Sequence, residues 1–306
     1  MVWPDGVDSQ GRSGARPALS WVGAGAYLVR MMRDDRFLPE CDVVRDWAWA
    51  ALLAAWEGGD NLRLAELAEC WLKDHPDDRD FRLWAADGLA AARHLEAAAG
   101  HLQAILDADP SDVEVVARLG HLYFRGGQID LAARLFGEAL ALRDDVADVH
   151  YGLGLVAEQR HDYVAAERAF ANAHRLDPDG FPLPVRLTDR EFEHCLKEAV
   201  QELPAELQVA LDLVAIVVQD LPDEESMRAV EPPDPELLGL FTGPTHGERH
   251  AGMGEMVPTI VLYRRNLERL SEDPDHLLEE ITTTLYHELG HYLGWDEEEV
   301  ARRGLE

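Results

Sequence analysis

The sequence predicts a multidomain protein in which an all-α array of helical repeats is followed by a small α+β domain. A residue pattern recurs every 34 positions from Arg45 to Gly180, as it does in stacked helical units. After Pro184 the recurrence ends, and short apolar runs rich in β-branched residues alternate with helical segments. We therefore expect a disordered tail and leading helix at residues 1–44, helical repeats at 45–180 and an α+β domain at 186–306.

The recurrent positions carry the residue types that a pair of antiparallel helices requires. A small alanine lets the helices approach closely, a large or aromatic residue fills the space between them, and a proline ends the second helix. The alanines are Ala98, Ala132 and Ala166, the large residues are Leu102, Phe136 and Phe170, and the prolines are Pro76, Pro110 and Pro178. The first frame is degenerate, with Leu64 at the alanine position, as is typical of a terminal unit.

This pattern resembles the tetratricopeptide repeat. Leu119-Gly120 and Leu153-Gly154 occupy the same position in two successive frames, and the alanine, the aromatic residue and the later alanine follow in the order of that family. The resemblance implies a concave groove that receives an extended peptide or a helix of a partner protein. The alternative is a structural role, in which the helices stabilise the neighbouring domain or an oligomer.

Acidic residues dominate the composition and restrict the class of partner. The chain has 59 acidic and 28 basic residues, which gives a formal net charge of -31. Such a charge repels phosphate groups, so we expect neither nucleic acid nor an anionic membrane as a partner. Cys41, Cys70 and Cys195 form no CxxC pair, and no apolar run has the length of a transmembrane helix. These features predict a cytoplasmic protein.

Caps, apolar runs and turn residues predict the elements of the α+β domain. Thr188 and Glu191 have the spacing of a capping box, which predicts a helix that runs to Glu202. Strands are expected at Leu213–Gln219, Leu237–Thr242 and Thr259–Tyr263. A final helix should begin at Asp273-Pro274 and end at Gly294.

The final predicted helix carries the sequence His287-Glu288-Leu289-Gly290-His291. Two histidines four residues apart lie on one face of a helix, where both imidazoles can bind one metal ion while the intervening glutamate reaches the attacking water. We therefore predict His287 and His291 as metal ligands and Glu288 as the catalytic acid/base. The alternative is an incidental histidine pair on a solvated or core face.

A catalytic zinc site normally has three protein ligands, so the pair needs one more. In the metzincin spacing, the third ligand is the sixth residue after the second histidine, with a glycine midway. That position is Glu297, and Asp296 is the runner-up. His246 and His250 in a Gly-rich loop are less favoured sources, and the alternative role of the acidic run is a solvated helix cap.

Residues 188–306 as a whole resemble the minimal zincin family of small bacterial proteins. The resemblance rests on the order of a helix, a strand, an acidic loop, LLGLFTG, TIVLYRRNLER and the HELGHYLGWDEEEV helix. It implies a pared-down, matrix-metalloprotease-like α+β fold and a bound Zn²⁺. It also implies His287, His291 and Glu297 as the metal ligands and Glu288 as the acid/base.

Together these features predict a zinc-dependent peptidase that hydrolyses peptide bonds with metal-activated water, while the repeats recruit a protein substrate or adaptor. The strand at Thr259–Tyr263 is expected to bind the substrate by accepting it as an additional strand. The alternative is a non-catalytic interaction scaffold with a structural or vestigial metal site.

Overall fold

The computed structural model of the protein describes residues 41–250, 256–296, 299 and 302. Most of the predicted tail and leading helix at residues 1–44 lies outside this part of the chain. The chain divides into two compact units, one that ends at Ala92 and one that begins at Arg93, and each is described by itself.

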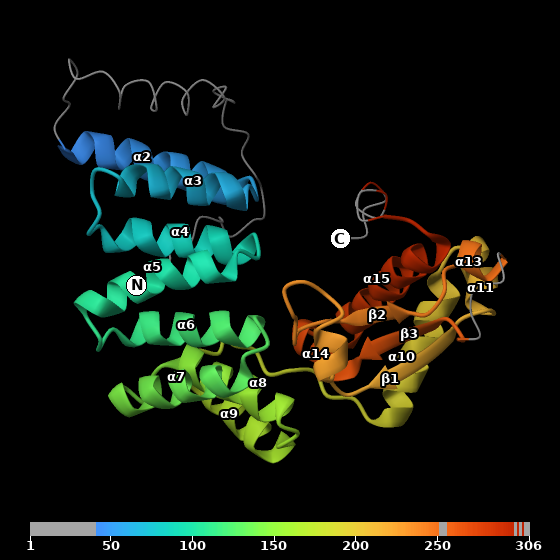
Figure 1. Ribbon diagram of the computed structural model, residues 1–306. Helices are drawn as coiled ribbons and strands as arrows, with labels where there is room; N and C mark the ends of the chain where they lie inside the picture. The colour runs from blue at the N-terminus through green and yellow to red at the C-terminus, as the bar shows by residue number, and fades with distance from the viewer. Residues whose placement is uncertain (1–40, 251–255, 297–298, 300–301, 303–306) are drawn as a thin grey trace, which may run out of the picture. The chain divides into compact units, whose positions relative to one another are not determined.

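The first part of the chain is helical, as the repeat pattern predicts (Figure 1). Its helices are α2 (Cys41–Glu57), α3 (Asn61–Leu72) and α4 (Arg79–Ala91) in the first unit, and α5 (Leu95–Ala108), α6 (Val113–Arg125), α7 (Ile129–Leu142), α8 (Ala147–Gln159) and α9 (Tyr163–Leu176) in the second. Several begin at an aspartate whose side chain accepts a hydrogen bond from a first-turn amide, such as Asp78 before α4 and Asp112 before α6. Asp78 and Asp112 are 34 residues apart, so this cap recurs with the period of the repeat.

The recurrent residues form the contacts between these helices. The alanines that were predicted to allow close approach, Ala98, Ala132 and Ala166, are all 0% exposed. Phe136 fills the space beside two glycines of neighbouring helices, since a Cβ on Gly120 or Gly152 would lie 2.8 or 2.3 Å from its ring. Small residues opposite an aromatic ring are therefore a steric requirement of this packing.

Replacement of Gly154 by alanine tests this requirement. A Cβ at Gly154 would lie 2.4 Å from the Phe170 ring, so we expect Gly154→Ala to lower the free energy of unfolding by about 1–3 kcal/mol. Gly137, also inside a helix, has nothing within 4 Å of its Cβ position, so Gly137→Ala should raise that free energy by about 0.5–1 kcal/mol. Urea unfolding followed by circular dichroism measures both, and equal effects would contradict the steric explanation.

The second part of the chain is a small α+β domain. Its elements are α10 (Asp189–Glu202), α11 (Ala205–Leu211), β1 (Ala215–Gln219), α12 (Glu224–Met227), β2 (Gly239–Thr242), α13 (His246–His250), β3 (Thr259–Tyr263), α14 (Arg264–Leu270) and α15 (Pro274–Leu293). The predicted caps are confirmed: Thr188 and Glu191 form a capping box, Asp273 caps α15, and Gly294 ends α15 with a φ of 86°.

The three strands form one sheet in the order β1-β3-β2. β1 is parallel to β3, with Ala215 opposite Thr259, and β2 is antiparallel to β3, with Thr242 opposite Thr259. Both sides of β3 are therefore paired. The prediction that Thr259–Tyr263 accepts a substrate strand is wrong, because only the edge strands β1 and β2 have a free side in the described sheet.

An apolar face fixes α15 against the sheet. Leu277, Ile281, Leu285 and Leu289 recur every four residues along α15 and are all 0% exposed. They share one core with Ile260 and Leu262 of β3 and with apolar residues of α10 and α11. Because this face is held by the core, the orientation of every other face of α15 is determined as well.

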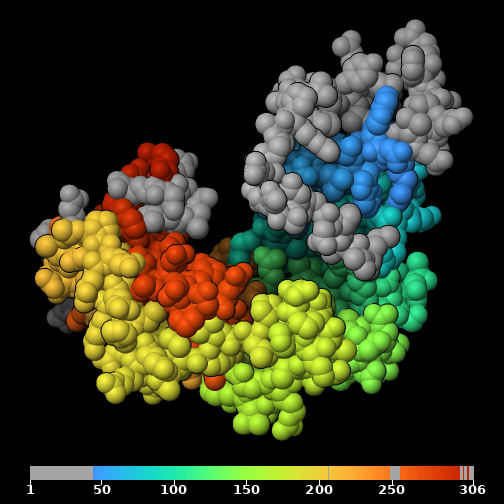
Figure 2. Space-filling view, turned by 180° about the vertical axis from the view of Figure 1, so that it is seen from behind, coloured from blue at the N-terminus to red at the C-terminus, as the bar shows by residue number. Residues whose placement is uncertain are grey.

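The last pair of repeat helices and the α+β domain belong to the same compact unit. In Figure 2 the yellow-green surface of these helices adjoins the yellow and orange surface of the residues that follow. Charged contacts join them: Glu158 of α8 binds Arg186 before α10 and Arg265 of α14, at 2.7 and 2.8 Å. The Val185 amide also donates to the Glu268 carbonyl at 3.0 Å.

Candidate metal and catalytic site

The two predicted imidazole ligands lie together on α15. The Nε2 atoms of His287 and His291 are 3.0 Å apart, and their ring centroids are 4.7 Å apart with the planes at 74°. Two imidazoles that bind one tetrahedral zinc ion at about 2.0–2.1 Å have their nitrogens roughly 3.3 Å apart. The pair therefore fits the separation that one metal ion requires.

Glu288 is a residue of α15, and its side chain faces the edge strand β2. It is 7% exposed, and a Cβ on Gly239 would lie 3.1 Å from its Cγ and 3.2 Å from its Oε1. The same Cβ would lie 2.6 Å from Cγ2 of Thr284, one turn earlier on α15. Only a glycine allows the β2 backbone to come this close to the carboxylate.

Tyr263, the last residue of β3, is close enough to Glu288 for the charge of that carboxylate to affect the pKa of its phenol. The side chain is 0% exposed, and burial is the main cause that raises the pKa of its phenol. The carboxylates of Asp223 and Glu288 raise that pKa further. Tyr263 therefore stays neutral beside Glu288 at any physiological pH.

The acidic run begins where α15 ends. Gly294 adopts a left-handed conformation, and the Trp295 amide donates to the Gly290 carbonyl at 2.9 Å. Asp296, the runner-up ligand, is exposed, and its Oδ1 accepts a hydrogen bond from the Glu299 amide at 2.9 Å. Glu297, the predicted third ligand, lies outside the described residues. Within the residues that the structure describes, no group of three or more His, Cys, Asp and Glu side chains is arranged to hold a metal.

Comparison with known protein families identifies both parts of the chain. Residues 211–305 match the model of a zincin-like metallopeptidase, and residues 118–181 match that of a tetratricopeptide repeat. The chain combines a zincin-like metallopeptidase domain with tetratricopeptide repeats. The suspected fusion of the two is thus confirmed.

The chain also has weaker similarity to individual known proteins. The general transcriptional corepressor ssn6 of Schizosaccharomyces pombe is 29% identical over 113 residues, which are 36% of this chain and only 10% of that protein. MamA from Desulfovibrio magneticus RS-1 is 19% identical, with 51% of this chain and 94% of that chain covered and a TM-score of 0.40. MamA AMB-1 is 26% identical, with 52% and 87% covered and a TM-score of 0.38.

None of the described helices has both the length and the apolar character that crossing a membrane requires.

His246 and His250 were predicted to lie in a loop, but the structure has the short helix α13 there, and this helix approaches α15 at His246. The ring of His246 lies edge-on to that of Tyr292, with centroids 5.8 Å apart. Tyr292 itself is 0% exposed and also contacts Phe241 of β2, at 5.9 Å. The side chain of His250 lies outside the described part of the chain. Tyr292 is therefore a core residue of α15 that packs against β2.

Sequence reasoning did not single out Gly239, Tyr263 or Asn266. Gly239 falls within the predicted strand LLGLFT, where an isolated glycine signals close backbone approach and was a usable clue. Asn266 is 2% exposed and donates through Nδ2 to the carbonyls of Pro235 and Leu237, just before β2. Nothing in the local sequence distinguishes it from a surface asparagine.

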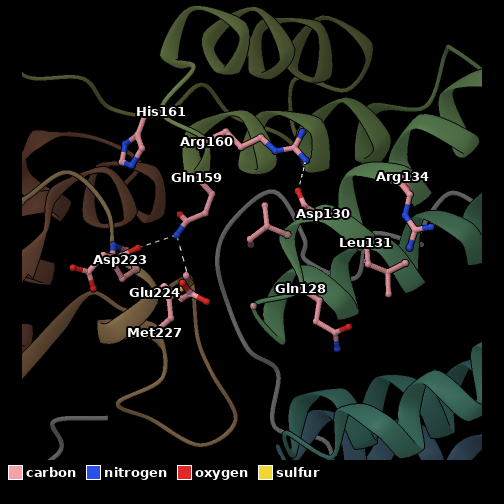
Figure 3. A pocket seen from close by; sticks show the side chains of 13 residues that line it. Gln128, Asp130, Leu131, Arg134, Gln159, Arg160, His161, Asp223, Glu224 and Met227 are labelled. Atoms are coloured by element: carbon pink, nitrogen blue, oxygen red, sulfur yellow. Dashed lines mark hydrogen bonds and ion pairs between the residues drawn. The ribbon is translucent and has the colours of Figure 1, made fainter.

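A cleft of about 700 Å³ lies away from α15 and β2, among the turns that follow α6 and α8 and the loop after β1 (Figure 3). Gln159 bridges its two walls, because its Nε2 donates to the Pro222 carbonyl at 2.9 Å. On the repeat side, Arg160 binds Asp130 at 2.6 Å. The Gln159 contact attaches the loop after β1 to the last repeat, whereas the Arg160 contact joins the end of α8 to α7.

Proposed function

We propose that the protein is a zinc-dependent peptidase whose repeats bind a protein substrate or an adaptor. The observation that supports this most directly is the convergence of His287 and His291 at 3.0 Å beside the nearly buried carboxylate of Glu288. A purely structural metal site does not require a base at that position. The match of residues 211–305 to zincin-like metallopeptidases supports the same reaction class.

His287 and His291 would hold the zinc ion through Nε2, and Glu297 would be the third ligand. When bound, zinc lowers the pKa of a coordinated water and polarises the carbonyl of the peptide bond. Glu288 would act as the general base and remove a proton from the attacking water. The same carboxyl group later donates that proton to the leaving amine.

The substrate would lie along the free edge of β2. β2 is antiparallel to β3 and has one unpaired side in the described sheet, and its first residue lies against Glu288. An extended peptide that pairs with this edge would receive main-chain hydrogen bonds and pass next to the carboxylate. β1 also has an unpaired side in the described sheet, but β2 is the strand whose first residue lies against Glu288, and this closeness favours β2.

The third ligand can be identified by paired substitutions. We expect Glu297→Gln to weaken zinc binding by about 10- to 100-fold, because the neutral amide is a poor ligand. Asp296→Asn is the matched control, since its carboxylate accepts the Glu299 amide and is expected to leave zinc affinity unchanged. Zinc titration against a fluorescent chelator measures both. A larger loss in Asp296→Asn would reverse the two assignments.

Metal content and proteolysis test the function as a whole. The purified full-length protein should contain about one zinc ion per chain, and the zinc-loaded protein should cleave fluorescein-labelled casein until 1,10-phenanthroline removes the metal. A protein that binds zinc but cleaves no peptide under any condition would favour the interaction scaffold. The interaction-scaffold hypothesis is supported separately by the match of residues 118–181 to the tetratricopeptide repeat, a type of repeat that commonly binds proteins.

A further inference from the structure

Asn266 holds the entry to the edge strand β2 in a fixed position. Its Nδ2 donates to the Pro235 carbonyl at 2.9 Å and to the Leu237 carbonyl at 2.7 Å, and β2 begins at Gly239. The orientation of this amide is determined by Arg269, whose Nη2 donates to Asn266 Oδ1 at 2.9 Å. Because a guanidinium can only donate, the oxygen must face Arg269 and the NH₂ group must face the two carbonyls.

Arg269 is in turn held by the last tetratricopeptide repeat. Its side chain is 7% exposed, and its Nη1 binds Glu158 Oε2 at 2.7 Å. Glu158 on α8 is 0% exposed, and its other oxygen accepts from Arg186 and Arg265 at 2.7 and 2.8 Å. A carboxylate this deeply buried is stable because three guanidinium groups compensate its charge, and its removal would leave Arg269 with an incompletely compensated charge.

A continuous set of contacts therefore leads from the repeat to the candidate catalytic residue. Glu158 binds Arg269, Arg269 binds Asn266, and Asn266 binds the Leu237 carbonyl, two residues before Gly239. The backbone of Gly239 lies against Glu288, so a shift of the strand entry changes the space around that carboxylate.

We propose that Glu158 is a positioning residue that acts through Arg269 and Asn266 to hold the edge strand β2 beside Glu288. The effect of Glu158 on catalysis rests on the proposed peptidase function, whereas its effect on the position of β2 does not. The last repeat thereby becomes a required part of the peptidase site in addition to any role in partner binding. A zincin-like domain separated from this repeat would have a loosened β2.

Hydrogen–deuterium exchange on the full-length protein tests the positioning without any substrate. In Glu158→Gln and in Asn266→Asp, amides at residues 237–242 should exchange about tenfold faster, as expected when one or two buried hydrogen bonds are lost. Glu167→Gln is the matched control. Glu167 belongs to the same cluster, but its described contacts are with Arg186 and Arg265, so β2 should exchange as in the parent protein.

A further variant separates positioning from general stability. Arg269→Lys keeps the positive charge beside Glu158, but a single ammonium group cannot replace the fork that also reaches Asn266. It should therefore loosen β2 while α8 and α15 keep parental exchange rates. Unchanged exchange at 237–242 in Glu158→Gln would overturn the proposal, as would unchanged exchange in both Asn266→Asp and Arg269→Lys or equal acceleration in Glu167→Gln.

Cleavage of fluorescein-labelled casein by the same zinc-loaded proteins links positioning to function. A loosened edge strand should raise the apparent KM about tenfold and change kcat less, because substrate binding to β2 is weakened while Glu288 and the metal ligands are unchanged. If the parent protein cleaves nothing, the peptidase function fails while the exchange result still decides the positioning of β2. If casein is cleaved and KM stays parental in variants with faster exchange, β2 does not bind the substrate and the proposed role in catalysis is wrong.

Discussion

Replacement of Glu288 by glutamine is expected to reduce peptide hydrolysis by at least about 1,000-fold while zinc stays bound. The amide has nearly the shape of the carboxylate, so it fits the narrow space beside Gly239, but it cannot accept a proton from the attacking water. The two imidazoles are unaffected, so the metal content should equal that of the parent protein. Cleavage of fluorescein-labelled casein and zinc analysis of the same sample measure both quantities.

Glu279→Gln provides the control for this change. Glu279 lies on the same helix but is exposed, so its replacement should leave both hydrolysis and metal content at parental values. Parental activity in Glu288→Gln would remove the general base from the mechanism and would favour a scaffold with a structural metal site. A loss of zinc together with activity would mean that Glu288 supports the metal site as well.

Replacement of His291 by alanine is expected to abolish tight zinc binding. One of two converging imidazoles is lost, and the remaining His287 and a single carboxylate would leave the ion largely hydrated. We expect the zinc affinity to fall by at least about 100-fold and hydrolysis to fall with it. The fold should persist, because the core face of α15 is formed by other residues, including Leu285 and Leu289.

His276→Ala is the matched control on the same helix. His276 lies in the first turn of α15, and its ring contacts Glu280 at 3.2 Å. Its replacement should leave zinc binding unchanged in the same titration. Parental zinc affinity in His291→Ala, with an intact circular dichroism spectrum, would refute the assigned pair and make His246 of α13 the next candidate ligand.

Several parts of the fold could be predicted from the sequence because they depend on neighbours along the chain. The limits of α15 follow from Asp273 and Gly294, and the capping box of α10 follows from Thr188 and Glu191. The strand Thr259–Tyr263 was predicted with its observed limits. For the other two strands, the observed β1 and β2 begin two residues later than predicted, at Ala215 and Gly239.

The role of each strand could not be predicted in the same way. An apolar run such as TIVLY is compatible with a central or an edge strand, and the sequence offers no direct measure of which strands pair. The sheet order puts β3 in the centre, so the free edge beside Glu288 belongs to β2 instead. The glycine in LLGLFT was visible in the sequence, but its packing against Thr284 and Glu288, which explains why a glycine is needed there, was not.

The sequence by itself determined the 34-residue repeat, the final helix and the His287-Glu288-His291 arrangement, because helical periodicity and capping act over a few residues. The tertiary structure alone decided which strand borders Glu288 and that Glu158 meets Arg269, 111 residues later in the chain. A buried carboxylate surrounded by guanidinium groups looks in the sequence like any solvated helix residue. Its burial depends on how distant segments pack, and no local pattern encodes that packing.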